Sequence, residues 1–420
     1  MEKFLKNPLT FIIFTIFLDA LGYGILIPIV PLLLADPSSS FFLLPKGYSV
    51  QSGYILLGLI TAIFPLVQLF STSILGQLSD KLGRKPILQN TLFLTSASYV
   101  LFAIGIAIRN IPLLFVSRAI AGFSSGNLSV AQAAIADITE PKDRAKNFGF
   151  IGAAFGLGFI IGPFLGGKLS DPSVLPFFNP TVPFLFAAFL SLMNAFSVRK
   201  FLKETNNYIN KHAVIAWGRS LVNILKAFKL ENLRFLFFVN FLFFSGFTFF
   251  VTFMSIFMIK KFGFNQGDIG NFFSFFGLWF LLTQAIVTGW VAKRLNEAQV
   301  LKICIIADGI AVGLMFLAPS TLFLYILAPF LALFNGLAFA NMGGLISRSA
   351  DQKIQGEILG ISASIQALAQ LIPPVLSGFI AAALTPETPL IIASLILILS
   401  GLIFTLFYKP PTSVAHIKDY

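Results

Sequence analysis

The sequence predicts an all-α membrane protein with twelve transmembrane helices in two pseudo-symmetric six-helix halves. Of its 420 residues, 57% are hydrophobic and only 11% are charged, and the mean hydropathy is +0.88. A soluble chain of this length could not cover its surface with so few charges, so its surrounding solvent must be lipid. Long apolar stretches recur along the chain, and one long polar, basic segment divides them into six and six.

The individual spans follow from length, since a helix that crosses the hydrocarbon core needs roughly 20 mostly apolar residues. The halves are residues 1–198 and 233–420, joined by a cytoplasmic linker, 199–232. The first span is too long for the apolar region of a signal peptide, and we expect it to be retained. Twelve stretches are predicted to span: 9–34, 53–75, 87–108, 111–137, 147–168, 181–198, 233–259, 269–291, 299–318, 320–347, 357–380 and 389–408.

The distribution of Lys and Arg predicts the orientation. Cytoplasmic segments of membrane proteins carry an excess of these residues. With both termini in the cytoplasm, only five of the 29 lie outside: Lys46, Arg109, Lys168, Lys260 and Lys261. This asymmetry explains the basic charge without nucleic acid. Within the linker, HAVIAWGRSLVNILKAFKL (212–230) is either an amphipathic helix on the anionic inner leaflet or a plain solvated segment.

The two halves are also related in sequence. GQLSDKLGRKP (76–86), after the second span, has a degenerate partner in GWVAKRLNEAQ (289–299), after the eighth. In the fifth and eleventh spans, Gly149 and Gly360 each precede a proline, Pro163 and Pro374, by fourteen residues. Such repeats are typical of secondary transporters, whose substrate site lies between the halves near the middle of the membrane.

Three charged residues lie well inside predicted spans: Asp19, Arg118 and Asp308. Such positions are energetically expensive and usually functional. Asp19 lies about ten residues into its span, roughly 15 Å deep at 1.5 Å per residue. A carboxyl group there can bind and release a proton as its exposure alternates, and Arg118 can modulate its charge. The alternatives are a packing hydrogen bond or a fixed Asp19–Arg118 ion pair. The single cysteine, Cys304, is expected to be a small buried hydrophobe.

The loop after the second span combines small and charged residues in a short segment. Gly76 and Gly83 permit a tight bend, Asp80 can accept from a helix N-terminus, and Arg84 can pair with Asp137 at the end of the fourth span. We predict a conformational latch; the alternative is an ordinary cytoplasmic loop rich in positive charge.

Small residues are dense in the fifth span, where they permit close helix packing around a proline that bends the helix. We predict a tight but mobile interface between the halves here; the alternative is that these residues only ease packing. They are Gly149, Gly158, Gly162, Pro163, Gly166 and Gly167.

Polar residues inside other spans are candidates for the substrate cavity. No metal-binding cluster, phosphate-binding loop or catalytic triad is present in the sequence, so we expect no catalytic site, metal site or cofactor. The cavity candidates are Asn127, Gln132, Asn240, Gln284, Asn335, Asn341, Gln366 and Gln370.

These motifs resemble the major facilitator superfamily over residues 9–408. GQLSDKLGRKP is similar to its loop signature, and the glycines from Gly149 to Gly167 resemble the signature of its proton-driven antiporters. LGYGILIPIVP (21–31) resembles the first span of twelve-span drug/proton antiporters. The resemblance implies that fold.

Within that group, the chain is most similar to tetracycline/proton antiporters, in segments such as RAIAGFSSG (118–126). The likeness implies transport roles for Asp19 and Asp308, and places Gln284 at a functional polar position. One departure is that Ser98 precedes Tyr99 where the family has an aspartate, so a carboxylate associated with the cationic metal–drug substrate is absent.

We therefore expect a monomeric, proton-coupled antiporter in the bacterial plasma membrane that exports amphipathic small molecules by alternating access. Its partners are the substrate, protons and the bilayer. The alternatives are a facilitator or importer of a small metabolite, a lipid or glycolipid transporter, and a receptor or membrane enzyme.

Overall fold

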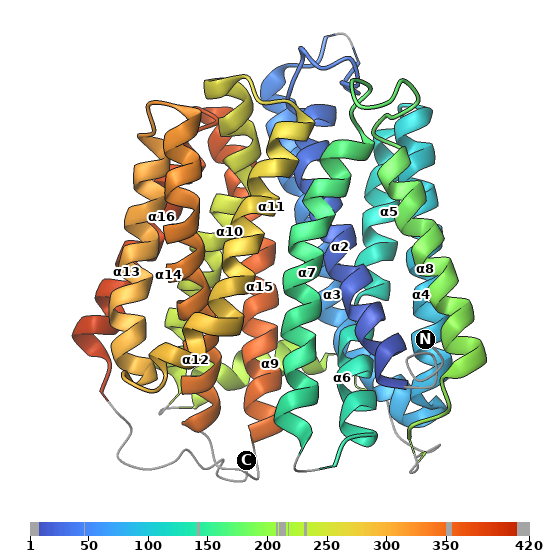
Figure 1. Ribbon diagram of the computed structural model, residues 1–420, viewed down its shortest axis with the longest axis vertical. Coiled ribbons are helices and arrows are strands. Elements are labelled where there is room, and N and C mark those ends of the chain that lie inside the picture. The colour runs from blue at the N-terminus through green and yellow to red at the C-terminus, as the bar shows by residue number, and fades with distance from the viewer. Residues whose placement is uncertain are drawn as a thin grey trace. The chain divides into compact units, whose positions relative to one another are not determined.

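The computed structural model describes residues 8–45, 47–140, 143–206, 209, 216, 218–230, 233–349 and 355–409, and its regular elements in this part of the chain are helices (Figure 1). In chain order they are α2 (Pro8–Leu34), α3 (Val50–Leu82), α4 (Arg84–Ala107), α5 (Ile111–Ser124), α6 (Asn127–Asp137), α7 (Arg144–Leu169), α8 (Val182–Phe201), α9 (Arg219–Lys229), α10 (Arg234–Phe262), α11 (Gln266–Leu282), the π-helix η2 (Thr283–Val287), α12 (Thr288–Val291), α13 (Glu297–Phe316), α14 (Thr321–Arg348), α15 (Gln355–Ala383) and α16 (Thr388–Phe407).

Eleven of the helical stretches in the described residues are long and apolar enough to cross a membrane. The remaining predicted span, 111–137, is not one continuous helix, because α5 ends at Ser124 and α6 begins at Asn127. Gly126, at the break, lies against the backbone of α3, where an added Cβ would be 2.7 Å from the carbonyl carbon of Ser71. The close approach of two backbones accompanies the interruption.

Short polar residues and glycines set several helix ends. The Asn110 side chain accepts a hydrogen bond from the Leu113 amide at the start of α5. Asn296 and Gln299 form a reciprocal capping box at the start of α13. Gly263 ends α10 with a φ of 68°, a left-handed conformation that favours glycine. These local signals fix where the chain turns between apolar helices.

The helices form two compact units. Unit 1 comprises Met1–Tyr48, Ile63–Gly218 and Phe264–Ser274; unit 2 comprises Ser49–Ala62, Arg219–Gly263 and Phe275–Tyr420. In unit 1, α2 packs along α7 and α4 packs along α8. In unit 2, α13 packs against α14 and α16, and α10 packs against α15 and α16. Each unit therefore contains most of one half of the sequence and the beginning of one helix, α3 or α11, from the other half.

The beginnings of α3 and α11 pack through equivalent glycine contacts, one in each unit. In unit 2, Gly58 of α3 lies on Gly378 of α15; in unit 1, Gly270 of α11 lies on Gly167 of α7. In both pairs an added Cβ on the first glycine would be 3.1 Å from the Cα of the second. The second glycine follows Pro374 or Pro163 by four residues, so the repeat in the fifth and eleventh spans is also a repeat in packing.

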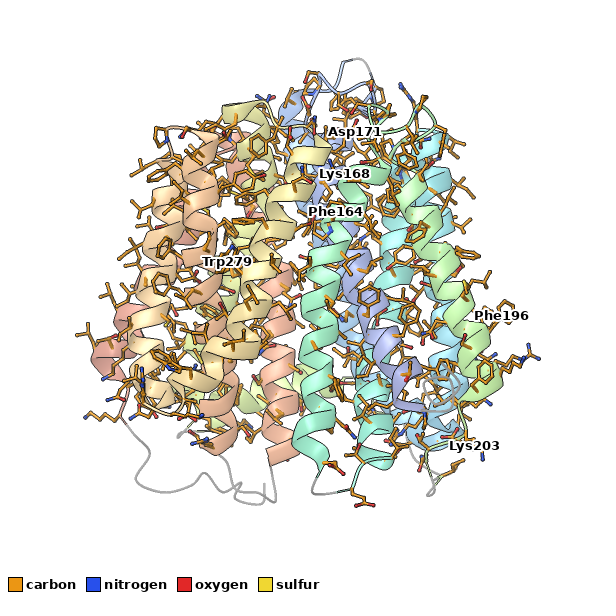
Figure 2. All side chains as sticks on the ribbon, viewed as in Figure 1. Phe164, Lys168, Asp171, Phe196, Lys203 and Trp279 are labelled. Atoms are coloured by element: carbon orange, nitrogen blue, oxygen red, sulfur yellow. The ribbon has the colours of Figure 1, made fainter. Side chains whose placement is uncertain are left out.

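The outer surface of each unit is apolar. Figure 2 shows Phe196 on the outside of unit 1, and its side chain is 53% exposed. Lys168 and Asp171 lie near one end of this unit and Lys203 near the other, so the charged labelled residues mark its two ends. Exposed aromatic side chains between charged ends are what a helical bundle presents to lipid.

Candidate functional site

A polar cluster lies inside unit 1, and we call its members Asp19, Tyr99, Arg118 and Asn127 the Asp19 cluster. They come from α2, α4, α5 and α6. Tyr99, Arg118 and Asn127 are buried. The Tyr99 hydroxyl reaches α2 where Gly22 has no side chain, and a Cβ at that position would overlap it. Four helices thus bring the predicted residues Asp19, Arg118 and Asn127 together.

The Asp19 carboxylate has no fixed partner of standard geometry. Its Oδ2 atom is buried and accepts no hydrogen bond from the described residues. The Asn127 side chain is close enough to interact with Asp19, yet neither of its amide atoms forms a hydrogen bond of standard geometry in the described structure. A buried polar group without a partner is rare and energetically unfavourable, so this carboxyl group is a candidate for binding a proton or a ligand.

Arg118 does not form the fixed ion pair with Asp19 that the sequence left open as an alternative. Its guanidinium lies over the Phe64 ring of α3, with Cζ 4.4 Å from the ring centroid. No ion pair joins Arg118 to a carboxylate of the described residues. A cation on an aromatic face is stabilised without being neutralised, so the positive charge remains available to the cluster.

Ser98, which precedes Tyr99 in α4, faces a different environment from Tyr99. Its hydroxyl donates to the Thr95 carbonyl of its own helix, and its backbone carbonyl accepts from Ser117 of α5. The side chain is completely buried. Ser98 therefore acts in packing between α4 and α5, while Tyr99 contributes to the Asp19 cluster.

The second intramembrane carboxylate, Asp308, lies in unit 2 and has a side-chain partner. The Asn335 amide of α14 donates to its Oδ2 atom at 2.9 Å, whereas the Oδ1 atom accepts no bond from the described residues. The next residue, Gly309, packs on α16, where an added Cβ would be 2.8 Å from the Ile398 amide nitrogen. Asn335, chosen from the sequence for a substrate cavity, is therefore committed to orienting Asp308.

Gln284 lies in η2, a π-helical turn between α11 and α12. The Gln284 amide donates to the Gly336 carbonyl of α14 at 3.1 Å, and the Thr288 hydroxyl donates to the Thr283 carbonyl five residues earlier. Gly336 permits the approach, because an added Cβ would be 3.0 Å from the Thr283 side chain. π-Helical turns are frequent at functional sites, which keeps this region of unit 2 a candidate.

The remaining cavity candidates have mixed surroundings. Asn240 is fully buried, and its side-chain amide nitrogen donates weakly to the Ser362 hydroxyl at 3.4 Å. Its side-chain amide oxygen has no described partner. Asn341 donates to the Leu337 carbonyl in its own helix. Gln132 is exposed, so its selection as a buried residue was wrong. Gln366 and Gln370 are partly exposed positions on α15.

The predicted latch residues also lie together in unit 1. Arg84 pairs with Asp80 at 2.6 Å and with Asp137 at 3.2 Å, and it donates to the Ser79 hydroxyl. The bend differs from the expectation, however. Helix α3 continues to Leu82, so Gly76 lies inside it, and only Gly83 turns the chain, with a φ of 100°. Gly76 instead permits contact with Ser129 of α6.

Glu204, which no sequence pattern singles out, completes this assembly from the beginning of the linker. Its carboxylate accepts from the Arg84 amide at 2.8 Å and from the Lys85 amide at 3.2 Å. The Thr205 hydroxyl donates to Asp137 at 3.4 Å. Carboxylates are favourable at helix N-termini because the first amides there lack helical partners. Glu204 thus caps α4, and its neighbour Thr205 contacts Asp137 of the predicted latch.

Removing this cap should destabilise the latch region. We expect Glu204→Ala to lower the stability of unit 1 by about 0.5–2 kcal/mol, the usual effect of losing a helix cap. Hydrogen exchange of the Arg84 and Lys85 amides should accelerate and the melting temperature should fall. Lys203→Ala is the matched control, since Lys203 is exposed and adjacent. Equal protection of these amides in both variants would contradict the capping role.

The glycine face of α7 packs only partly as predicted. Gly158, Gly162 and Gly166 lie against α2, at Ala20–Leu21, Gly24 and Ile25 respectively. These three glycines do not form the predicted interface between the six-helix halves. Helical spacing predicts which residues share a face, but it does not specify which helix packs against that face. The Pro163 carbonyl and Gly167 do meet the beginning of α11, which belongs to the C-terminal half, so close packing between the halves is present at these two positions. An added Cβ at Gly149 would have no neighbour within 4 Å.

Comparison with known proteins agrees with this architecture. The family model described as Major Facilitator Superfamily matches residues 12–285 and 236–419. The tetracycline resistance proteins of class D from Salmonella ordonez and class H from Pasteurella multocida are 31% and 30% identical over 368 residues, covering 86% of each chain. Multidrug resistance protein 2 of Bacillus subtilis (strain 168) is 26% identical over 94% of this chain and 93% of its own.

Solved structures show the same fold. The D-xylose-proton symporter has a TM-score of 0.76 at 15% identity, covering 96% of this chain and 98% of its own. The human organic anion transporter MFSD10 (TETRAN) has a TM-score of 0.70 at 23% identity, covering 94% and 98%. These relatives and fold neighbours are transporters and not enzymes. The chain belongs to the major facilitator superfamily, as an integral membrane transporter similar to tetracycline resistance proteins.

Proposed function

We propose that this transporter is a proton-coupled antiporter that exports amphipathic small molecules by alternating access. The observation that supports it most directly is the Asp19 carboxylate, which lies inside unit 1 with a buried oxygen that has no described hydrogen-bond partner. A carboxylate in a permanent ion pair would stay charged throughout a cycle. One without a fixed partner can be protonated from one side and deprotonated towards the other.

Arg118 has a separate part in this proposal. Its guanidinium stays charged on the Phe64 face, so it can favour release of the Asp19 proton when the two groups approach and favour retention when they separate. Tyr99 lies within electrostatic reach of both groups. The groups proposed for coupling therefore belong to one polar cluster inside unit 1.

The proton gradient could drive useful export. A proton that enters down a total proton gradient equivalent to 100 mV releases about 2.3 kcal/mol, which corresponds to a roughly forty-fold concentration ratio at tenfold per 1.4 kcal/mol. We propose that one exported molecule is exchanged for at least one entering proton. Asp308, oriented by Asn335, is a second candidate proton site in unit 2.

The proposed substrates are neutral or cationic amphipathic molecules. The similarity to tetracycline and multidrug resistance proteins supports export of drugs. Ser98 is buried and its hydroxyl bonds within its own helix, so it supplies no carboxylate to a metal–drug complex. Export of such a complex is therefore not expected. The location proposed is the bacterial plasma membrane, with both termini in the cytoplasm, as the Lys and Arg distribution indicates.

The proposal is tested by transport in proteoliposomes with an imposed pH gradient. Cationic dyes, neutral amphipathic drugs, metal-chelated tetracycline and sugars should be compared, each with and without an ionophore that collapses the gradient. We expect concentrative transport of the first two classes only when the gradient is present. Transport of sugars, or equal transport without the gradient, would favour a metabolite facilitator instead.

The cation–aromatic contact leads to a second test. Phe64→Leu removes the ring under Arg118, an interaction of about 0.5–2 kcal/mol, and leaves the guanidinium free to pair with Asp19. We expect slower pH-driven transport with normal folding, whereas Phe64→Tyr, which keeps the aromatic face, should transport at the original rate. Equal rates in the Leu and Tyr variants would show that the contact has no part in coupling.

A further inference from the structure

The linker helix α9 presents an unusual surface. Leu225 and Phe228 are 63% and 67% exposed, as much as the Phe407 side chain at the end of α16, and Leu221 and Val222 are also exposed. These four apolar residues follow helical spacing and form one face, which we call the α9 apolar face. No described residue covers it. A helix that faced only water would present polar residues there.

The opposite side of α9 is fastened to unit 2. Ser220 and Ala227 are buried, and Lys226 forms an ion pair of 2.5 Å with Glu357 in the first turn of α15. Asn223 lies beside Gly360, one turn further along α15. The helix is therefore held against the beginning of a membrane-spanning helix, at the end that the Lys and Arg distribution places in the cytoplasm.

The charged side chains of α9 itself are all positive. Its sequence, RSLVNILKAFK, contains three cations and no acid. At the same end of unit 2, the Arg294 guanidinium lies over the ring of the exposed Trp290, with Cζ 3.9 Å from the ring centroid. Lys293 is also exposed. Figure 1 shows α9 and α12 near the same end of this unit. Tryptophan and cations at one level are typical of the membrane interface.

We propose that α9 is an interfacial helix that inserts its apolar face into the inner leaflet and binds the headgroups of anionic phospholipids. The exposed apolar side chains would enter the boundary between headgroups and acyl chains, while Lys229 and the neighbouring cations contact phosphate. The Lys226–Glu357 ion pair links this lipid contact to α15. The proposal is independent of the transported substrate and of proton coupling.

Spin-label accessibility in proteoliposomes tests this proposal. Labels are placed at L225C and F228C in a full-length Cys304→Ser background, since the only native cysteine is Cys304. Leu406, exposed on α16, is the lipid-facing reference position, and Ser173, in an exposed loop, is the aqueous reference position. Collision with oxygen, which partitions into lipid, is compared with collision with a water-soluble nickel complex.

In vesicles that contain phosphatidylglycerol, both α9 labels should match the Leu406 reference. In pure phosphatidylcholine, or with the added substitution Lys229→Gln, they should shift towards the Ser173 reference. Glu357→Gln, which breaks the ion pair but keeps the cations of α9, should retain insertion. Nickel access equal to that at Ser173 in the anionic vesicles would overturn the proposal, as would protection from both reagents, which indicates a protein cover. Insertion that is insensitive to phosphatidylglycerol would overturn headgroup binding.

Discussion

Replacing Asp19 with asparagine is expected to abolish pH-driven accumulation of substrate while leaving folding and downhill exchange intact. The amide keeps the size of the carboxyl group but cannot bind and release a proton. The neighbours Tyr99, Arg118 and Asn127 are all retained, so the surroundings of position 19 should persist. In proteoliposomes the variant should lose the roughly forty-fold accumulation that one proton could support under a pH gradient equivalent to 100 mV.

Two controls make this result specific. Asp36→Asn removes a carboxylate in the loop after α2. The asparagine oxygen can still accept the hydrogen bond from the Ser38 amide, so this variant should transport normally. Asp19→Glu keeps an ionisable group and should recover part of the coupling. Full uphill transport by Asp19→Asn in well-folded protein would remove Asp19 from the coupling mechanism.

Enlarging Gly162 to leucine should also abolish coupled transport, through the position of α2. An added Cβ alone would be 2.6 Å from the Leu21 carbonyl oxygen and 2.9 Å from the Gly24 Cα, both backbone atoms that cannot rotate away. Helix α2 must therefore move, and it carries Asp19. Overpacking typically destabilises a protein by about 1–3 kcal/mol, so the melting temperature should fall and the Asp19 cluster should be displaced.

The same helix offers the matched control. An added Cβ at Gly152 would have no neighbour within 4 Å, so Gly152→Leu makes the same chemical change on α7 without the contact. Melting temperature, proton leak and substrate flux should be measured on both variants. We expect the Gly152 variant to resemble the unmodified protein. Normal coupling in the Gly162 variant would show that the close α2–α7 packing is unnecessary for transport.

The ion pairs of Arg84 show what local sequence can predict, while their action as a latch stays a prediction. GQLSDKLGRKP combines a positive-φ glycine, an acid and an arginine within a few residues, and the Arg84–Asp137 pairing follows from their predicted positions at the ends of adjacent spans. Glu204 could not be found in this way, because it reaches α4 from 120 positions later in the chain and carries no recognisable motif. Its approach depends on the path of the linker, which short-range patterns do not determine.

The glycines of α7 show a different limit. Their spacing correctly indicates a shared helical face with close packing, but the same spacing suits any partner helix. Gly158, Gly162 and Gly166 face α2, whereas Gly167 faces the beginning of α11. Likewise, Asp19 and Arg118 were identified from their positions inside apolar spans, yet the role of Phe64 under the guanidinium was not. An aromatic residue in a chain with 51 phenylalanines carries no individual signal.

The most direct test of antiport is to drive protons with substrate. Proteoliposomes are loaded with a transported amphipathic drug at equal internal and external pH, then diluted into drug-free buffer while a trapped dye reports internal pH. An obligate antiporter should acidify the interior as drug leaves, and the acidification should vanish in Asp19→Asn vesicles. Rapid drug efflux with no change in internal pH, in vesicles of low proton permeability, would contradict coupled exchange and identify a facilitator.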